Sequence, residues 1–544
     1  MTERHIFTYQ TRLLLDAAQA AVLDAYAELY GKAERSLFAA MRAGSAINDL
    51  KREFLPKFGI TARQFNAVRV GLQGKIDSIK ARRPELIVEL ESRIKKATKV
   101  VSKLTLSTSA AAKLHQKKRR LAILNTKLEA LQSDHKAGTV RLCFGSKKRF
   151  RAQFDLAANG YETHDGWRQD WERSRSNQFF VLGSGDETAG NQSCQAELGD
   201  DGGLNLAVRL PNAQVAHGSP KTLILTGLRF AYGHNAIAAA LQSSQRVTST
   251  TKAGKATLKR VGSALSYRFV RDEQGWRVFV SCEAPAVTPT SRSALGAVGV
   301  DINADHLAVS EVDRFGNLMQ ARRVELHTYG LSTDQAKALI GDAAVSIVTQ
   351  AKTAGKPLVI EKLNFQKKKA ELEATDARYA RMLSSFACNK VVSCLKAAAF
   401  RAGIEVIEVN PAYTSVIGAV NHAQAKGVSV HMGAAAAVAR RGLRLSERVP
   451  KRQVVVPARN GGHVTFVVPA RNRSKHVWSQ WGKVRASLKA AHVAHGRSGL
   501  PKGMPAPLSP EMRALGAHRP VTAKLRDANR QQHCSAGVLD DIPW

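Results

Sequence analysis

Two acidic residues, each placed at the end of a short apolar run, carry the clearest chemical signal in this sequence. Asp301 follows Val298–Val300, and Glu361 follows Leu358–Ile360 later in the chain. Short apolar runs of this kind predict buried central β-strands. Two carboxylates side by side at the ends of such strands can hold a divalent cation. The pattern therefore predicts that Asp301 and Glu361 are both catalytic residues and metal ligands.

The segments around the two acids predict a single α/β sheet domain. Alternating apolar residues indicate strands, Ala, Leu and Ile at spacings of three and four indicate helices, and Gly and Pro mark the ends. The predicted order is strand (298–301), strand (306–313), strand (318–326), helix (333–352), strand (358–361), helix (378–401) and strand (404–410). This is the order of a ribonuclease H fold. Either acid alone fits a loop residue or a helix cap. Two carboxylates buried together at central strand ends would be costly, so a cation or a hydrogen-bond donor that offsets this cost explains the pair better.

Four segments extend this pattern into a family resemblance. They are Gly299–Asp301, Val359–Asn364 (VIEKLN), Val409–Ser415 (VNPAYTS) and the helix that runs from His431 to Gly442. Over about residues 295–445 the chain resembles the TnpB-like proteins of bacterial insertion sequences, which are RNA-guided nucleases related to type V CRISPR effectors. The resemblance implies a RuvC-like nuclease domain that uses Mg²⁺ or Mn²⁺, a guide RNA and a target DNA.

Two features depart from that family. Its members usually carry a zinc ribbon of two Cys-x-x-Cys pairs, whereas the cysteines of this chain form no such pair, so we expect no structural zinc. At the third catalytic position the family has an acidic residue, and this chain has His431. Asp527 imitates the missing acidic motif but comes too late in the chain.

The histidine leaves the chemistry of the third position open. A neutral imidazole offers one nitrogen and no negative charge, so it should weaken a second magnesium site. It can instead orient or activate the attacking water, as an auxiliary catalytic residue. A third interpretation is that His431 only begins a helix.

The charge of the chain predicts a nucleic-acid partner independently of these motifs. Lys and Arg number 82 against 44 Asp and Glu, which gives a formal net charge of +38 and a pI near 10.3. This excess is far greater than solubility requires, and binding to phosphates would be strongly salt-dependent. Any single cation is more simply a solvated surface residue, and a Trp pair is more often packed. The candidate contacts are Lys117, Lys118, Arg119, Arg120, Lys367, Lys368, Lys369, Arg440, Arg441, Arg471, Arg473, Lys475, Trp478 and Trp481.

The whole chain is predicted to be a multidomain α+β protein. Residues 1–15 give the first strand of a wedge domain, 16–136 a helical recognition domain, 137–292 a wedge β-barrel, 293–448 the RuvC-like domain, and 449–544 a basic, partly disordered extension. The resemblance implies that the helical domain clamps a guide–target hybrid and that the wedge grips the guide RNA. No apolar run is long enough to span a membrane, and sparse cysteine agrees with a cytoplasmic location.

Three functions fit these observations. The first is a transposon-associated, RNA-guided DNA endonuclease that hydrolyses phosphodiesters with a metal ion. The second is an RNA-guided DNA-binding protein with weak or no cleavage, which would silence a locus by occupancy, because His431 replaces the third acid. A distant third is a transposase that performs strand transfer.

Overall fold

The computed structural model describes residues 5–106, 111–250, 256–284, 287–363, 370, 372–374, 388–451, 453–457 and 462–498. Their contacts form two compact units. The first takes the chain up to Ile87 together with Glu129–Ala286, and the second takes Val88–Leu128 together with Val287–Ile542. The finer division into five domains stays a prediction. Among the described residues, no helix has the length and apolar character needed to cross a membrane.

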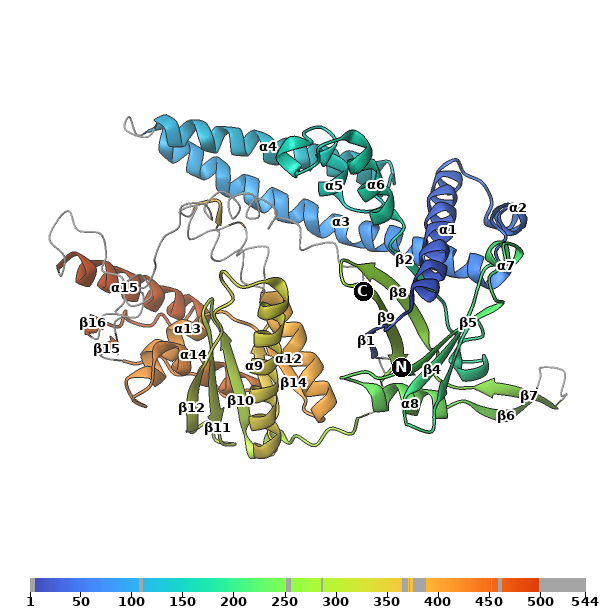
Figure 1. The fold of residues 1–544 in the computed structure, drawn as a ribbon. Helices are drawn as coiled ribbons and strands as arrows, with labels where there is room; N and C mark the ends of the chain where they lie inside the picture. The colour runs from blue at the N-terminus through green and yellow to red at the C-terminus, as the bar shows by residue number, and fades with distance from the viewer. Residues whose placement is uncertain are drawn as a thin grey trace, which may run out of the picture. The chain divides into compact units, whose positions relative to one another are not determined.

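Four long helices follow the first strand, as the apolar spacing over residues 16–132 predicts. They are α1 (Ala17–Arg42), α2 (Ile47–Phe58), α3 (Ala62–Thr105) and α4 (Ala111–Lys136) (Figure 1). Helix α1 begins at a capping box, in which the Asp16 side chain accepts from the Gln19 backbone and the Gln19 side chain accepts from the Asp16 backbone. Helices α3 and α4 each contribute residues to both units.

The strands of the first unit form three sheets. One has the order β1 (Ile6–Arg12), β9 (Gly275–Glu283), β8 (Ser266–Asp272) and β2 (Gln178–Val181). The second is β3 (Cys194–Leu198), β4 (Leu204–Arg209) and β5 (Thr222–Leu228), and the third is the hairpin β6 (Gln245–Thr250) and β7 (Ala256–Val261). The short helices are α5 (Lys147–Ala152), α6 (His164–Arg175), α7 (Asn212–Ala216) and α8 (His234–Gln242). The first strand joins the later strands as predicted. Within the described residues no ladder closes these sheets, so the β-barrel stays a prediction.

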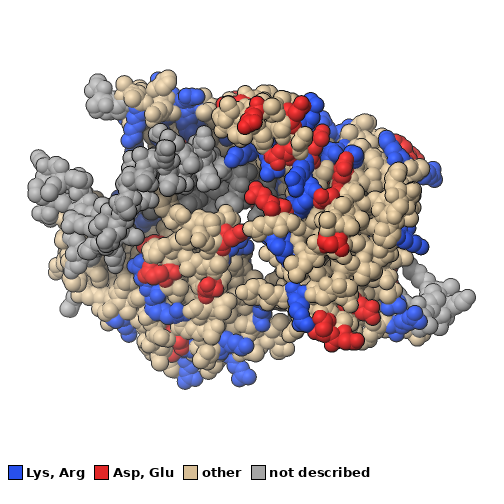
Figure 2. Space-filling view, in the orientation of Figure 1, with Lys and Arg blue, Asp and Glu red and all other residues tan. Residues whose placement is uncertain are grey.

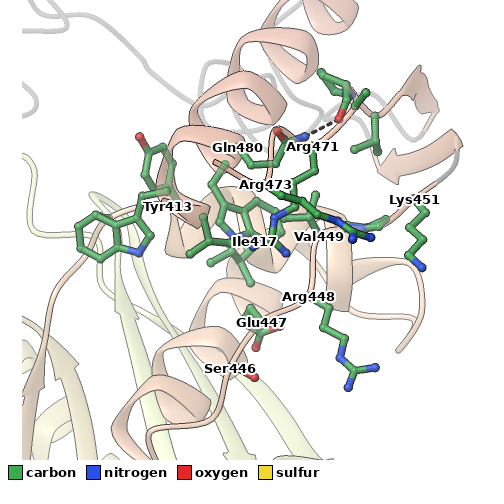
Figure 3. Close-up of a pocket in the computed structure, with 18 of the residues that line it drawn as sticks. Tyr413, Ile417, Ser446, Glu447, Arg448, Val449, Lys451, Arg471, Arg473 and Gln480 are labelled. Atoms are coloured by element: carbon green, nitrogen blue, oxygen red, sulfur yellow. Dashed lines mark hydrogen bonds between the residues drawn. The ribbon is translucent and has the colours of Figure 1, made fainter. Parts of the chain in front are cut away.

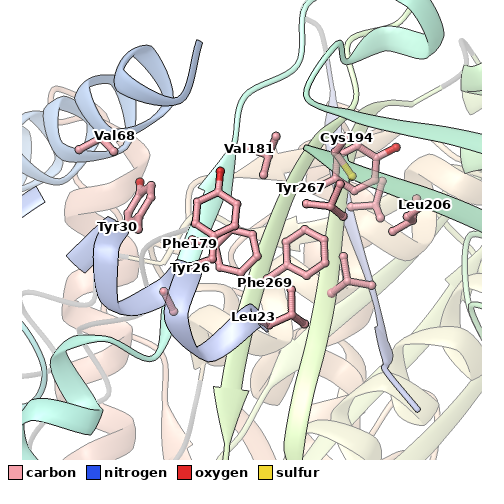
Figure 4. Close-up of a cluster of buried hydrophobic side chains, with 14 of the residues drawn as sticks. Leu23, Tyr26, Tyr30, Val68, Phe179, Val181, Cys194, Leu206, Tyr267 and Phe269 are labelled. Carbon is pink, nitrogen blue, oxygen red and sulfur yellow. The ribbon is translucent and has the colours of Figure 1, made fainter. Parts of the chain in front are cut away.

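Stacked aromatic rings form the centre of the first unit. Phe179 of β2 lies between Tyr26 of α1, at a ring-centroid distance of 4.1 Å, and Phe269 of β8, at 4.7 Å (Figure 4). Strand alternation directs these side chains to one face, and burial of each large ring contributes about 2 to 3 kcal/mol. This core fixes α1 against the four-stranded sheet.

The second unit is built on a five-stranded sheet. Its order is β12 (Leu318–Glu325), β11 (His306–Val312), β10 (Ala297–Ile302), β13 (Leu358–Glu361) and β14 (Val406–Val409). The first three strands are antiparallel, and β10, β13 and β14 are parallel. The strand order predicted for a ribonuclease H fold is therefore confirmed.

Helices cover both faces of this sheet. Helix α9 (Thr333–Ala354) starts at the capping box of Ser332 and ends at Gly355, and α12 (Cys388–Ala402) ends before Gly403, as predicted. Residues 378–387 of the predicted second helix lie outside the described residues. These two helices pack on Val298, Val300 and Ile302. The opposite face is covered by α14 (Val430–Gly442), which the short helices α13 (Thr414–Ile417) and η5 (Gly418–Ala423) precede.

A hairpin and a helix follow the sheet domain. The two predicted β-like runs form β15 (Gln453–Pro457) and β16 (His463–Val467), which pair antiparallel, and α15 (Val477–Ser498) follows them. Within the extension that was predicted to be partly disordered, α15 continues to Ser498. Residues 499–544 lie outside the described residues.

Candidate active site

The two predicted acids lie at matching positions on neighbouring parallel strands. The β10–β13 ladder pairs Val300 with Ile360, so Asp301 and Glu361 are each the next residue along their strands. Neighbouring strands are about 4.8 Å apart, and alternation places both carboxylates on the face that α14 covers. Asp301 is 7% exposed and Glu361 is 8% exposed. The fold therefore brings the two acids together, as the sequence predicts.

Each carboxylate is held by neighbouring polar groups. Asp301 Oδ2 accepts from Asn303 Nδ2 at 3.0 Å and from His431 Nδ1 at 3.2 Å. Glu361 Oε1 accepts from the Thr414 hydroxyl at 2.5 Å. Because buried carboxylates are costly without donors, these hydrogen bonds offset part of that cost and fix both side chains in place.

Helix α14 delivers His431 to Asp301. The helix begins where the Ser429 side chain accepts from the Met432 backbone, and the Ser310 hydroxyl of β11 donates to the Met432 carbonyl at 2.7 Å. His431 thus does begin a helix, and its ring also faces the carboxylate. Its side chain is 43% exposed. The imidazole thus lies against the Asp301 carboxylate and brings no carboxylate of its own.

Sequence reasoning missed the polar residues of the β10–β11 turn. His306 Nδ1 donates to Asp305 Oδ1 at 2.8 Å, and the His306 ring meets the His431 ring edge-on at 4.9 Å between centroids. Burial lowers the pKa of His306, although the hydrogen bond to Asp305 acts in the opposite direction. The sequence feature that could have indicated these residues is the short hairpin directly after Asp301, because such a hairpin brings His306 back beside Asn303.

The donor set fits one hard cation better than two. Within the described residues, no three or more His, Cys, Asp or Glu side chains are grouped so that they could share a metal ion. Magnesium is commonly held by one or two carboxylates, with waters and substrate phosphates as its other ligands. Asp301 and Glu361 meet that requirement for a single ion. A second ion would find no further carboxylate there among the described residues, because the side chain that α14 contributes is the His431 imidazole.

A basic, partly aromatic pocket lies near Glu361. It has a volume of about 830 Å³, with Tyr413 at one end and Lys451 at the other (Figure 3). Tyr413 directly precedes Thr414, whose hydroxyl holds Glu361. Arg471, Arg473 and Trp478, all predicted as nucleic-acid contacts, line this pocket. Tyr413 and Thr414 therefore connect the wall of this pocket, with its candidate phosphate-binding cations, to the predicted metal ligand Glu361.

The predicted tryptophan pair divides into one exposed and one buried ring. Trp478 is 41% exposed and meets Tyr413 edge-on at 6.4 Å. Trp481 is 2% exposed and packs in a hydrophobic core with Ile417 and Val484. Trp481 therefore follows the packed alternative and, as a buried ring, does not offer the nucleic-acid contact for which it was a candidate.

Several predicted cationic contacts already have partners within the protein. Arg440 donates to Glu447 and to the Gly316 carbonyl, while Arg441 donates to the carbonyls of Asn410 and Ala412. These arginines fix α14 and the pocket wall. Their role in binding phosphate is therefore less direct than the sequence suggests.

A second set of predicted nucleic-acid contacts binds Glu373. Its carboxylate accepts from Arg93 of α3 at 2.6 Å and from Arg120 of α4 at 3.1 Å, and its carbonyl accepts from Lys117 at 2.5 Å. Burial acts to raise the pKa of Glu373, but the arginine hydrogen bonds outweigh it and lower that pKa. Arg93 and Arg120 thus neutralise a buried acid in this structure, and Lys117 is held by the backbone of the same residue.

The remaining predicted contacts are surface residues or lie outside the description. Lys118, Arg119 and Lys475 are exposed. Lys367, Lys368 and Lys369 lie outside the described residues. Basic and acidic side chains are interspersed over the face drawn in Figure 2. The excess charge therefore does not mark out a single binding patch on this face.

The environment of Glu447, on the pocket wall, predicts that the stability of the folded protein depends on pH. Burial acts to raise its pKa, but hydrogen bonds from His422, Asn421 and Arg440 lower it to about 2 from an ordinary 4.5. The ionised form therefore stabilises the fold above pH 4.5, and that contribution is lost as pH falls towards 2. We expect Glu447→Gln to lower the free energy of unfolding by roughly 2 kcal/mol at pH 7.

This penalty should shrink when the pH falls from 5 to 3. Urea unfolding at several pH values measures it, with the exposed Glu405→Gln as the matched control. A penalty that is equal at pH 7 and pH 3 would contradict the assigned hydrogen bonds.

Comparisons with known proteins find only distant structural similarity. No family model matches it, and no curated protein matches it either. Among solved structures, a RuvC from T. thermophilus in complex with a Holliday junction substrate is similar over 27% of this chain and 90% of that chain, at 13% identity and a TM-score of 0.20. A CRISPR-Cas12f ternary complex is similar over 81% of this chain and 100% of that chain, at 11% identity and a TM-score of 0.18. TM-scores this low carry no argument about function.

Proposed function

We propose that this protein is a metal-dependent nuclease, and that its substrate is DNA selected by a guide RNA, as in TnpB-like proteins. One observation carries the nuclease proposal. Two buried carboxylates occupy matching ends of the two central parallel strands in a ribonuclease H-ordered sheet, on the face where α14 adds a histidine. A protein gains nothing in stability from placing two acids there, so a ligand with positive charge explains them best.

The residues of the site have separable tasks in this proposal. Asp301 and Glu361 would hold Mg²⁺ or Mn²⁺, which when bound supplies an activated water and neutralises charge on the scissile phosphate. Asn303 and Thr414 orient the two carboxylates through their hydrogen bonds. His431 directs Nδ1 to Asp301, which leaves Nε2 as an acceptor for a proton from water.

The pocket supports a nucleic-acid substrate. Arg471, Arg473 and Lys451 supply positive charge, and the exposed Trp478 ring supplies a stacking surface. Phosphate neutralisation combined with base stacking is how proteins hold single strands without sequence preference. Because Tyr413 on the pocket wall adjoins Thr414, a strand in this pocket would pass close to Glu361. The proposal that a guide RNA binds rests on the motif resemblance and on the net charge of +38.

A second candidate is RNA-guided DNA binding with weak or no cleavage. The observation that favours it is the contact between His431 and Asp301, because this imidazole stands where a third carboxylate would help to hold a second ion. One-ion hydrolysis and occupancy without hydrolysis both agree with that geometry. They differ in whether the bound target is cut.

Removal of the metal tests the proposal. The protein is purified together with any RNA that co-purifies, that RNA is sequenced, and the complex is incubated with a plasmid that matches the RNA. We expect linear DNA with Mg²⁺ or Mn²⁺ and intact plasmid after addition of EDTA, because Asp301 and Glu361 have no function in hydrolysis without the ion. Equal cutting in EDTA would refute metal dependence. Retarded but uncut plasmid would select the second candidate.

A further inference from the structure

The turn between β10 and β11 contains a chain of polar side chains that ends on Asp301. Asp305 accepts from His306 Nδ1 at 2.8 Å, His306 Nε2 lies 3.4 Å from Asn303 Nδ2, and Asn303 Nδ2 lies 3.0 Å from Asp301 Oδ2. His306 is 5% exposed, which is unusual for an ionisable residue that begins a strand. The proposed hydrolysis does not by itself assign a task to Asp305 or His306.

The direction of each hydrogen bond in this chain is fixed by chemistry. The Asp305 carboxylate can only accept, so His306 Nδ1 carries a proton. His306 Nε2 faces the Asn303 side-chain nitrogen, a donor, and is therefore the acceptor of that contact, which agrees with the pKa that burial lowers. Asn303 must then present its NH₂ group to His306 and to Asp301 at once, because its carbonyl would repel the Asp301 carboxylate.

We propose that Asp305, His306 and Asn303 form a positioning relay that fixes the Asp301 carboxylate for metal binding. Through this relay Asn303 is held against Asp301 Oδ2, which His431 also contacts. The other oxygen, Oδ1, would thereby be the atom available to hold a metal ion. Groups that orient a metal ligand in this way change metal affinity about 10- to 100-fold when they are removed. The relay rests on the proposed function and adds residues that contact neither metal nor substrate.

The affinity for Mn²⁺ alone, measured by electron paramagnetic resonance titration of the full chain, tests the relay without any cleavage assay. We expect His306→Ala to weaken Mn²⁺ binding about 10-fold or more. His306→Gln should recover part of the loss, since its amide can donate to Asp305 and accept from Asn303. The matched control is His327→Ala on the same domain, where the ring is 65% exposed and pairs with Glu325, and its affinity should equal that of the unmodified protein.

A second variant covers the case in which removal of the buried ring impairs folding. The Asp305 side chain is 54% exposed, so Asp305→Ala should fold. It should still weaken Mn²⁺ binding, because His306 Nδ1 loses the acceptor that fixes which ring nitrogen carries the proton. If both residues act through one relay, the double variant Asp305→Ala/His306→Ala should bind Mn²⁺ no more weakly than His306→Ala. Additive losses would overturn the relay and indicate independent effects.

The outcomes separate this inference from the proposed function. If Asp301→Asn abolishes Mn²⁺ binding while Asp305→Ala and a folded His306→Ala bind normally, the relay is refuted and the metal site stands. If Asp301→Asn binds Mn²⁺ as tightly as the unmodified protein, the metal site itself is refuted, and the proposed function falls with the relay.

Discussion

Asp301→Asn is expected to lower the rate of target cleavage by about a thousand-fold or more, while RNA and DNA binding persist. The substitution keeps the shape of the side chain but removes the negative charge that would hold the cation. Metal stabilisation of a phosphodiester transition state contributes several kcal/mol, and about 4 kcal/mol corresponds to a thousand-fold change in rate. Single-turnover cleavage at saturating Mg²⁺, together with gel-shift affinity, measures the two effects separately.

The matched control for this variant is Asp342→Asn. Asp342 lies on the exposed side of α9, in the same domain but on the sheet face opposite to the one that carries Asp301. Its substitution removes the same charge and should leave cleavage unchanged. If Asp301→Asn cuts as fast as Asp342→Asn, the assignment of the active site is wrong.

Gly299→Ala is expected to destabilise the sheet domain by roughly 3 kcal/mol, the upper end for overpacking of a core. A Cβ at this position would lie 2.1 Å from the Ala435 carbonyl oxygen and 2.7 Å from the Ala439 nitrogen. Both atoms belong to the α14 backbone, so the helix as a whole must move. Because α14 also carries His431, we expect slower cleavage in the fraction that folds. Denaturant unfolding measures the first effect.

At a second glycine, the same Gly→Ala substitution is expected to raise the free energy of unfolding instead of lowering it. Gly341 lies inside α9, and a Cβ there meets nothing within 4 Å. Since alanine is the better helix former, Gly341→Ala should stabilise the domain by roughly 0.5 to 1 kcal/mol. Equal stabilities for the two variants would mean that β10 and α14 are not in close contact.

The order of the sheet domain could be predicted from sequence because its signals are local. Apolar runs marked β10 and β13, the Ser332 cap and Gly355 bounded α9, and the two acids ended the central strands. In a ribonuclease H order those strands are neighbours, so the proximity of Asp301 and Glu361 followed from topology. The β-barrel could not be tested in this way, since pairing between distant strands depends on register that local pattern does not encode.

The parts of the site that sequence missed depend on orientation in space. Asn303 and His306 were visible as residues, but their hydrogen bonds depend on the geometry of a short turn. Charge type could not distinguish the exposed Lys118 from Lys117, whose Nζ donates to the Glu373 carbonyl. Likewise, the spacing of two tryptophans gave no indication that Trp481 faces a core and Trp478 faces solvent.

The backbone at Tyr413 couples the pocket to the chemistry. Its φ of +63° is a left-handed conformation that a bulky side chain adopts at a cost on the order of 1 kcal/mol or more. This kink turns the chain between β14 and α13, so that the phenol ring lines the pocket and the next hydroxyl reaches Glu361. A molecule bound in the pocket would therefore contact the residue next to the one whose hydroxyl holds Glu361.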